Sequence, residues 1–111
     1  MDTTDKLTRI NLEIGVAEDR GDTEYFERLL ASAFAMRRAN GALVDRVQFL
    51  KDVAVSGPRS TTIDDVSLLG DARALVTCHV KMGGNSYHNL RLFIREGEDW
   101  ELLAWANESA L

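Results

Sequence analysis

The stretch that decides the fold is RALVTCHVKMGGNSYHNLRLFIREGEDWELLAWAN, residues 73–107. It contains three runs rich in β-branched and aromatic residues, separated by turn sequences at Gly83-Gly84-Asn85 and Gly97-Glu98. Runs of this length with glycine turns between them indicate antiparallel strands joined as a meander. We expect strands at 73–82, 86–95 and 100–107, with a further strand at 61–69 before the Gly70-Asp71 turn.

The run from Arg73 to Met82 alternates apolar and mostly polar residues, so one of its faces is expected to be buried. The apolar face consists of Ala74, Val76, Cys78, Val80 and Met82. A three-residue turn centred on Gly84 would pair Cys78 with Leu90. That register places His88 on the apolar face, and it places five residues on the other face: His79, Tyr87, Asn89, Arg91 and Phe93.

The N-terminal half of the chain carries helical patterns. Apolar residues recur every three or four positions from Thr4 to Arg20, and Gly21 is suited to end that helix. A second helix is expected around Tyr25–Leu30, a short hairpin at 34–44 around Asn40-Gly41, and a third helix that ends before Gly57-Pro58. The whole pattern predicts an α+β fold in which N-terminal helices pack on a curved antiparallel sheet.

Composition limits the classes of function. A chain of 111 residues with 45% hydrophobic residues suits one domain, 1–111. A net charge of -5 disfavours binding to nucleic acid. Cys78 is the single cysteine, so neither an internal disulfide nor a site of paired thiolates is expected. The polar N-terminus and the lack of a long apolar run predict a cytoplasmic protein without membrane contact, and no cofactor is expected.

The last strand is apolar on both of its faces, with Leu103 and Trp105 on one and Leu102, Ala104 and Ala106 on the other. A sheet covered on one side only should alternate more clearly. We therefore expect a homodimer through the sheet, and the alternative is a monomer whose helices wrap the sheet more fully.

Three segments carry a resemblance to a known family: FAMRRANG at 34–41 leading to Phe49-Leu50, NLRLFIR at 89–95, and WELLAW at 100–105. With the order of elements, they resemble the nuclear transport factor 2-like superfamily, a cone-shaped, cystatin-like α+β roll. The similarity extends to its branch of unknown function related to polyketide-cyclase-like and ketosteroid-isomerase-like domains. Members often have histidine and proline before the first hairpin turn, where Arg38 and Ala39 stand here.

The resemblance implies a small hydrophobic ligand in a pocket between the helices and the sheet. The residues expected to bind it are His79, Tyr87, His88, Asn89, Arg91 and Trp105. Arg91 could instead form a local salt bridge, clamp an anion, or stack on Trp105. His79 and His88 fall on opposite faces in the expected register, so no metal site is predicted.

Two other functions compete with binding. An isomerase, cyclase or hydratase would need a buried base, for which Asp64, Asp65 or a histidine are the candidates, because one of the two aspartates should point toward the helices. No catalytic residue is assigned, and Cys78 lacks the basic neighbours that activate a thiol. The third function is a dimerising interaction module with a collapsed cone.

Overall fold

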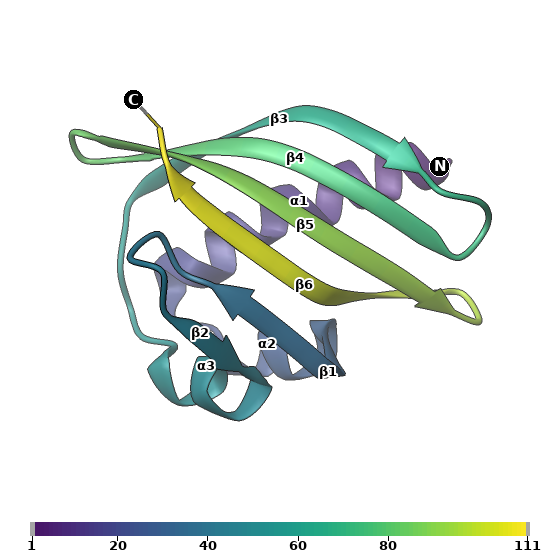
Figure 1. The fold of residues 1–111 in the computed structure, drawn as a ribbon, viewed down its shortest axis with the longest axis horizontal. Coiled ribbons are helices and arrows are strands. Elements are labelled where there is room, and N and C mark those ends of the chain that lie inside the picture. The colour runs from purple at the N-terminus through teal and green to yellow at the C-terminus, as the bar shows by residue number, and fades with distance from the viewer. Residues whose placement is uncertain (1, 111) are drawn as a thin grey trace.

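Nine helices and strands follow one another in residues 2–110, which are the residues that the structure, a computed structural model, describes (Figure 1). The helices are α1 (Thr3–Arg20), α2 (Thr23–Leu29) and α3 (Arg46–Asp52). The strands are β1 (Leu30–Arg37), β2 (Leu43–Asp45), β3 (Arg59–Leu68), β4 (Arg73–Met82), β5 (Asn85–Glu96) and β6 (Asp99–Ser109). The predicted α+β class with N-terminal helices on a curved sheet is therefore confirmed.

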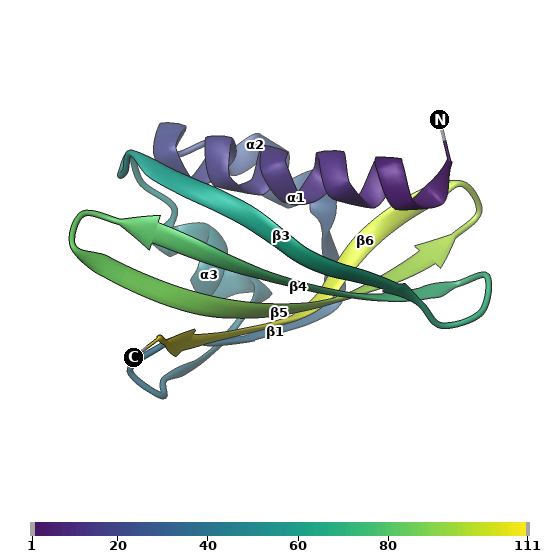
Figure 2. The ribbon, with the colours of Figure 1, turned by 90° about the horizontal axis from the view of Figure 1, so that it is seen from above.

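The six strands form one sheet in the order β2-β1-β6-β5-β4-β3. β3 to β6 form the antiparallel meander that the glycine turns predict. β1 runs parallel to β6, so the sheet is mixed rather than wholly antiparallel. Figure 2 shows the sheet curving beneath α1 and α2, which gives it a concave face toward the helices and an outer face away from them.

The helix α1 is positioned by its caps and by its apolar stripe. Asp2 caps its start by accepting a hydrogen bond from the backbone N–H of Asp5 at 2.8 Å. Leu7, Ile14 and Ala17 are buried against the sheet. Gly21 ends the helix in a left-handed conformation, with a φ of 66°. The side chains of α1 thus form the roof of the cone.

The pairing of β4 with β5 differs by one residue from the register expected from the sequence. The turn holds two residues, Gly83 and Gly84, so Cys78 pairs with Asn89 and not with Leu90. Two-residue loops match the twist of paired strands, and Gly83 supplies a positive φ of 63°. Because side chains alternate along a strand, this single shift moves every side chain of β5 to the other face.

The expected faces of β5 are therefore wrong. The concave face carries Tyr87, Asn89, Arg91 and Phe93, together with Val76, Cys78 and Val80 of β4. The outer face carries His88 beside His79.

Two irregularities change the parity of the neighbouring strands. In β3 the pairing shifts between Ile63 and Asp65, so Asp64 and Asp65 are both exposed and neither points toward the helices as expected. In β6 the pairing shifts opposite Leu92 and Phe93, so that Leu102 and Trp105 are both buried on the concave face.

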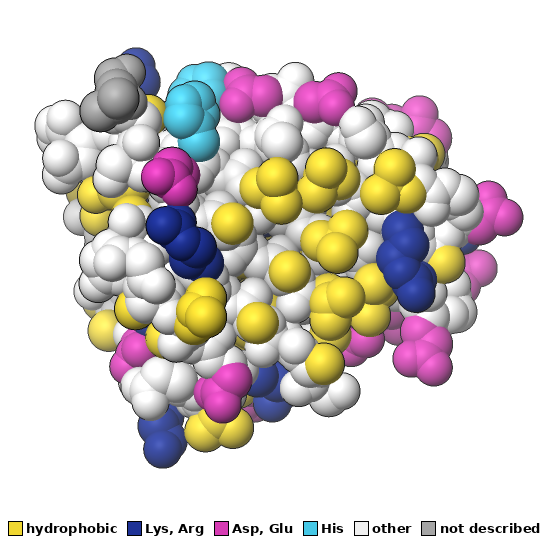
Figure 3. All heavy atoms as spheres, in the orientation of Figure 1, with side chains coloured by type: hydrophobic (Ala, Val, Ile, Leu, Met, Phe, Trp, Pro, Cys, Tyr) yellow, Lys and Arg dark blue, Asp and Glu magenta, His cyan; other side chains and the backbone are white. Residues whose placement is uncertain are grey.

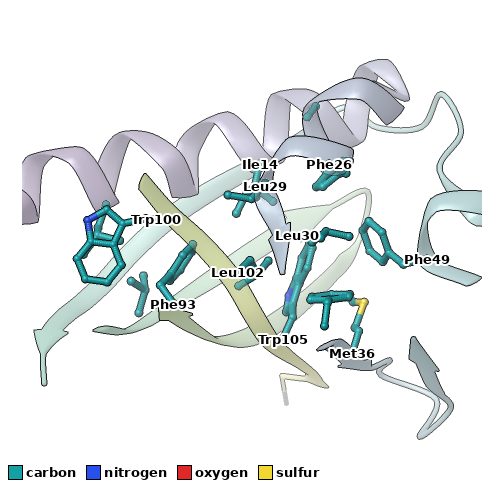
Figure 4. Packing of buried hydrophobic residues seen from close by; sticks show 14 of the residues in the cluster. Ile14, Phe26, Leu29, Leu30, Met36, Phe49, Phe93, Trp100, Leu102 and Trp105 are labelled. Atoms are coloured by element: carbon teal, nitrogen blue, oxygen red, sulfur yellow. The ribbon is translucent and has the colours of Figure 1, made fainter. Parts of the chain in front are cut away.

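The core lies between the concave face and the helices. Figure 4 shows its large side chains in a row from Trp100 at one end, past Phe93 and Leu102, to Trp105 and Phe49 at the other. At this second end, the Phe49 ring packs against those of Phe26 at 5.1 Å and Trp105 at 5.8 Å. The aromatic cluster at this second end borders open space.

A segment that we call the strap, residues 53–58, links α3 to β3 and crosses the end of α1. The backbone N–H of Ser56 donates to the carbonyl of Asp19 at 3.1 Å, and its hydroxyl donates to the carbonyl of Glu18 at 3.0 Å. A Cβ on Gly21 would lie 2.6 Å from the backbone N of Val55. The strap can therefore pack this closely against the end of α1 only because residue 21 is glycine.

We predict that Gly21→Ala destabilises the fold more than Gly70→Ala. Both glycines have positive φ, so each alanine costs about 1–2 kcal/mol of backbone strain. Only Gly21 also meets the backbone of the strap, and such overpacking adds roughly 1–3 kcal/mol, while a Cβ at Gly70 has open space. Urea denaturation of both variants measures the difference, and equal losses would contradict the role of the strap.

Candidate functional site

A pocket of about 480 Å³ opens in the cone beside the aromatic cluster. The strap and α3 form one wall, the β1–β2 hairpin forms another, and β4 to β6 form the floor. Its large apolar lining residues come from three strands and two helices: Phe26, Met36, Phe49, Val80, Met82 and Trp105. The pocket also has polar and charged residues in its lining, so its interior combines apolar and polar surface.

Two arginines form ion pairs in the walls of this pocket. Arg38 of the hairpin region lies 2.8 Å from the carboxylate of Asp52 in α3. Arg59 of β3 lies 2.8 Å from the carboxylate of Glu18, and it also donates to Asp19 at 2.7 Å. The wall carboxylates that line the pocket, Glu18 and Asp52, therefore each have an arginine as a direct partner.

Glu18 is the wall carboxyl with a shifted pKa. Its side chain is only 20% exposed, and burial raises its pKa above the ordinary value of 4.5. The positive charge of Arg59 acts in the opposite direction and is the smaller effect. A carboxyl with a raised pKa keeps its proton to a higher pH than an exposed carboxyl does.

Arg91 lies beneath the floor of the pocket, in the middle of β5, and its side chain has 0% exposure. Its guanidinium donates to the side-chain oxygen of Asn11 at 3.1 Å and to that of Asn89 at 3.2 Å. The same guanidinium stacks on the Trp105 ring, 4.4 Å from the centroid. Burial lowers the pKa of Arg91, but an arginine stays protonated at neutral pH.

Asn89 connects this cation to the pocket. It is 4% exposed and lines the pocket, and its side-chain oxygen also accepts a hydrogen bond from the indole N–H of Trp105 at 2.5 Å. Both neighbours of that oxygen are donors, so chemistry fixes the orientation of the amide. The buried Nδ2 atom of Asn89 has no hydrogen-bond partner within residues 2–110.

The structure separates the six residues predicted to bind a ligand into two groups. Tyr87, Asn89 and Trp105 line the pocket, and Arg91 lies directly against two of them. His79 and His88 lie outside the pocket, on the outer face. The stacking of Arg91 on Trp105, one of the possibilities raised by the sequence, is present.

His79 and His88 share a face, which corrects the expectation that they point opposite ways. They are directly paired across β4 and β5, with ring centroids 6.4 Å apart, and Nδ1 of His79 lies 2.9 Å from the carboxylate of Asp64. Among the described residues, no group of three or more histidine, cysteine or acidic side chains is placed to hold a metal ion. Cys78 is buried on the concave face, where burial raises the pKa of its thiol.

Sequence reasoning missed Glu18, Arg59 and Asn11. Glu18 and Arg59 are far apart in the chain and meet only because the strap returns to the end of α1. Asn11 lies within the apolar stripe of α1, where its side chain donates to the carbonyl of Leu7 at 2.7 Å. A polar residue inside an apolar stripe was the one signal available, because buried polar groups usually have a partner elsewhere.

Solved structures share this fold over nearly the whole chain. An NTF2-like protein of unknown function in nutrient uptake from Rhodospirillum rubrum is similar with a TM-score of 0.85 and 16% identity, over 95% of this chain and 98% of that one. An NTF2-like protein from Cytophaga hutchinsonii gives a TM-score of 0.84 and 15% identity, over 99% and 100%. The association domain of CaMKII from C. elegans gives 0.77 and 16%, over 95% and 94%.

No family model matches the sequence, and no curated protein matches it. The likeness to solved structures, at these low identities, establishes the fold alone. That fold is NTF2-like, and a further similar structure is described as a domain of unknown function with a cystatin-like fold. The fold that the sequence resemblance implies is confirmed. Within the described residues, no helix is long and apolar enough to cross a membrane.

We predict that Glu18 makes stability depend on pH. Because its native pKa lies above 4.5, the native state keeps a proton that the unfolded chain has already released as pH rises. The free energy of unfolding of the wild type, relative to Glu18→Gln, should therefore fall as pH rises above about 4.5 and level off above the native pKa.

Urea denaturation between pH 4 and pH 9 measures this difference. Glu27→Gln, at an exposed position on α2, is the control for removing one negative charge. A stability difference that grew with pH would show that the ion pair with Arg59, rather than burial, governs the pKa of Glu18.

Proposed function

We propose that the chain binds a small, largely apolar molecule in the pocket of its cone. The observation that carries this proposal is a pocket of about 480 Å³ whose lining combines large apolar side chains with polar and charged groups. Small-molecule sites in proteins have volumes of about 300–1,000 Å³ and this mixture of surfaces. Phe49 and Trp105 offer aromatic faces for such a molecule, and Asn89 offers a hydrogen-bond donor.

The structure gives more support to binding than to catalysis, because the side chains expected to act as bases lie outside the pocket. Asp64 and Asp65 are exposed to solvent on β3, and His79 and His88 lie on the outer face. None of these four residues lines the pocket. Glu18 does line it, but its contact with Arg59 ties it to the wall and supplies a structural reason for its presence.

We propose further that two copies of the chain associate through their outer faces. Figure 3 shows apolar side chains gathered in the middle of this face, where charged side chains lie mainly at the margins. The apolar residues on β4, β5 and β6 that point this way are Leu75, Leu90, Leu92, Ala104 and Ala106. One structure with this fold is described as an association domain, which is in keeping with this proposal. A cytoplasmic location stays a prediction.

We predict that a large side chain at the rim closes the pocket. Ala39 lines the pocket, whereas Ala42 in the same hairpin is exposed and does not. Ala39→Trp should abolish the fluorescence gain of the neutral apolar probe N-phenyl-1-naphthylamine, and Ala42→Trp should leave it at the wild-type level. A fluorescence gain that both variants retain would place the probe outside the cone and would count against the proposed function.

We predict that Leu90→Glu yields a monomer. Leu90 is 44% exposed on the outer face, and a buried, unpaired carboxylate in an interface costs several kcal/mol. Leu12→Glu is the matched control, because Leu12 is 45% exposed on α1, away from that face. Sedimentation equilibrium should give twice the chain mass for the wild type and for Leu12→Glu. A monomeric wild type would contradict the dimer proposal.

A further inference from the structure

The pocket floor contains a cation without an anion. Arg91 is fully buried, and each of its hydrogen-bond acceptors within residues 2–110 is a neutral oxygen, from Asn11 or Asn89. Its Nε atom has no partner at all among those residues. A buried charge is costly unless an opposite charge and hydrogen bonds compensate it. What Arg91 lacks among these residues is therefore an anion in direct contact.

The wall carboxylates do not fill that role by contact. Glu18 is bound to Arg59, and Asp52 is bound to Arg38. Neither carboxylate forms a hydrogen bond with Arg91. Arg59 contacts both Glu18 and Asp19, and Arg38 contacts Asp52, so each of these carboxylates has a wall arginine as its direct partner and none of them contacts Arg91.

Asn89 transmits the charge of Arg91 toward the pocket. The guanidinium and the Trp105 indole both donate to the amide oxygen, at 3.2 Å and 2.5 Å, and they draw electron density away from the amide nitrogen. The unpartnered Nδ2 of this pocket-lining residue is therefore a strengthened donor. A donor of this kind selects an acceptor, and it selects an anionic acceptor most strongly.

We propose that the ligand of the pocket carries a carboxylate, which accepts a hydrogen bond from Nδ2 of Asn89 and supplies the negative charge that Arg91 lacks. This inference rests on the proposed small-molecule binding and deepens it. The apolar part of the ligand then lies against Phe49, Met36 and Val80, so the ligand is an amphipathic acid rather than a simple hydrocarbon.

Matched pairs of probes test the proposal without altering the protein. Benzoate, 2-naphthoate and octanoate are each compared by calorimetry with their own primary amides, which have nearly the same shape but no charge. We expect the carboxylate to bind at least tenfold more tightly than its amide in every pair that binds. Equal affinities within the pairs would overturn the carboxylate proposal and leave the proposed function standing, and no binding by either member would overturn both.

The variant Asn89→Asp places the missing charge in the protein itself. It keeps the acceptor for Arg91 and Trp105, replaces the free donor by an acceptor, and should reverse the preference so that the amides bind more tightly than the carboxylates. The melting temperature should rise, because Arg91 gains a charged partner. Asn85→Asp, the same change at an exposed position of β5, is the control that should keep the wild-type preference.

A carboxylate preference that Asn89→Asp leaves unchanged would overturn the assignment to this floor. A melting temperature of Asn89→Asp below that of Asn85→Asp would overturn the claim that Arg91 lacks a counter-charge.

Discussion

The structure depends on the hydrogen bonds of one buried guanidinium, that of Arg91, inside the cone. Arg91 lies in a central strand of the sheet and has no exposure to water, so protein oxygens must accept the hydrogen bonds of its N–H groups. Asn11 supplies them from α1, and Asn89 supplies one from the same strand. These contacts tie the helix to the sheet at a fixed separation. The pocket lies beside this network, and Asn89 and Trp105 belong to both.

The distribution of charge follows from the same constraint. The chain carries a net charge of -5, yet its most deeply buried ionisable side chain is a cation. The walls of the pocket add ion pairs of Arg38 with Asp52 and of Arg59 with Glu18 and Asp19, which connect the hairpin to α3 and the start of β3 to the end of α1. The buried cation beneath the pocket thus contrasts with the negative net charge of the whole chain.

The fold was predictable from alternation and glycine turns, and so were the residue types that form the pocket floor. Asn89, Arg91 and Trp105 stood out in the sequence because polar and aromatic groups interrupt apolar strands. Their shared face was not predictable, because it depends on whether the Gly83–Gly84 turn holds two residues or three, and that choice changes every assignment on β5. The bulges in β3 and β6 have no clear sequence signal either. The contact between Glu18 and Arg59 was not predictable either, because it depends on how the strap leads the chain back to the end of α1.

The division between floor and rim has an evolutionary consequence. The floor belongs to central strands, where a substitution disturbs pairing and core packing at once. The rim belongs to the strap and to the hairpin, which are connecting segments that tolerate changes in length and side chain. Substitutions in these connecting segments can therefore change the shape of the pocket mouth while the floor stays the same. Changes to the floor residues disturb the central sheet, so the shape of the mouth can vary more freely during evolution than the chemistry of the floor.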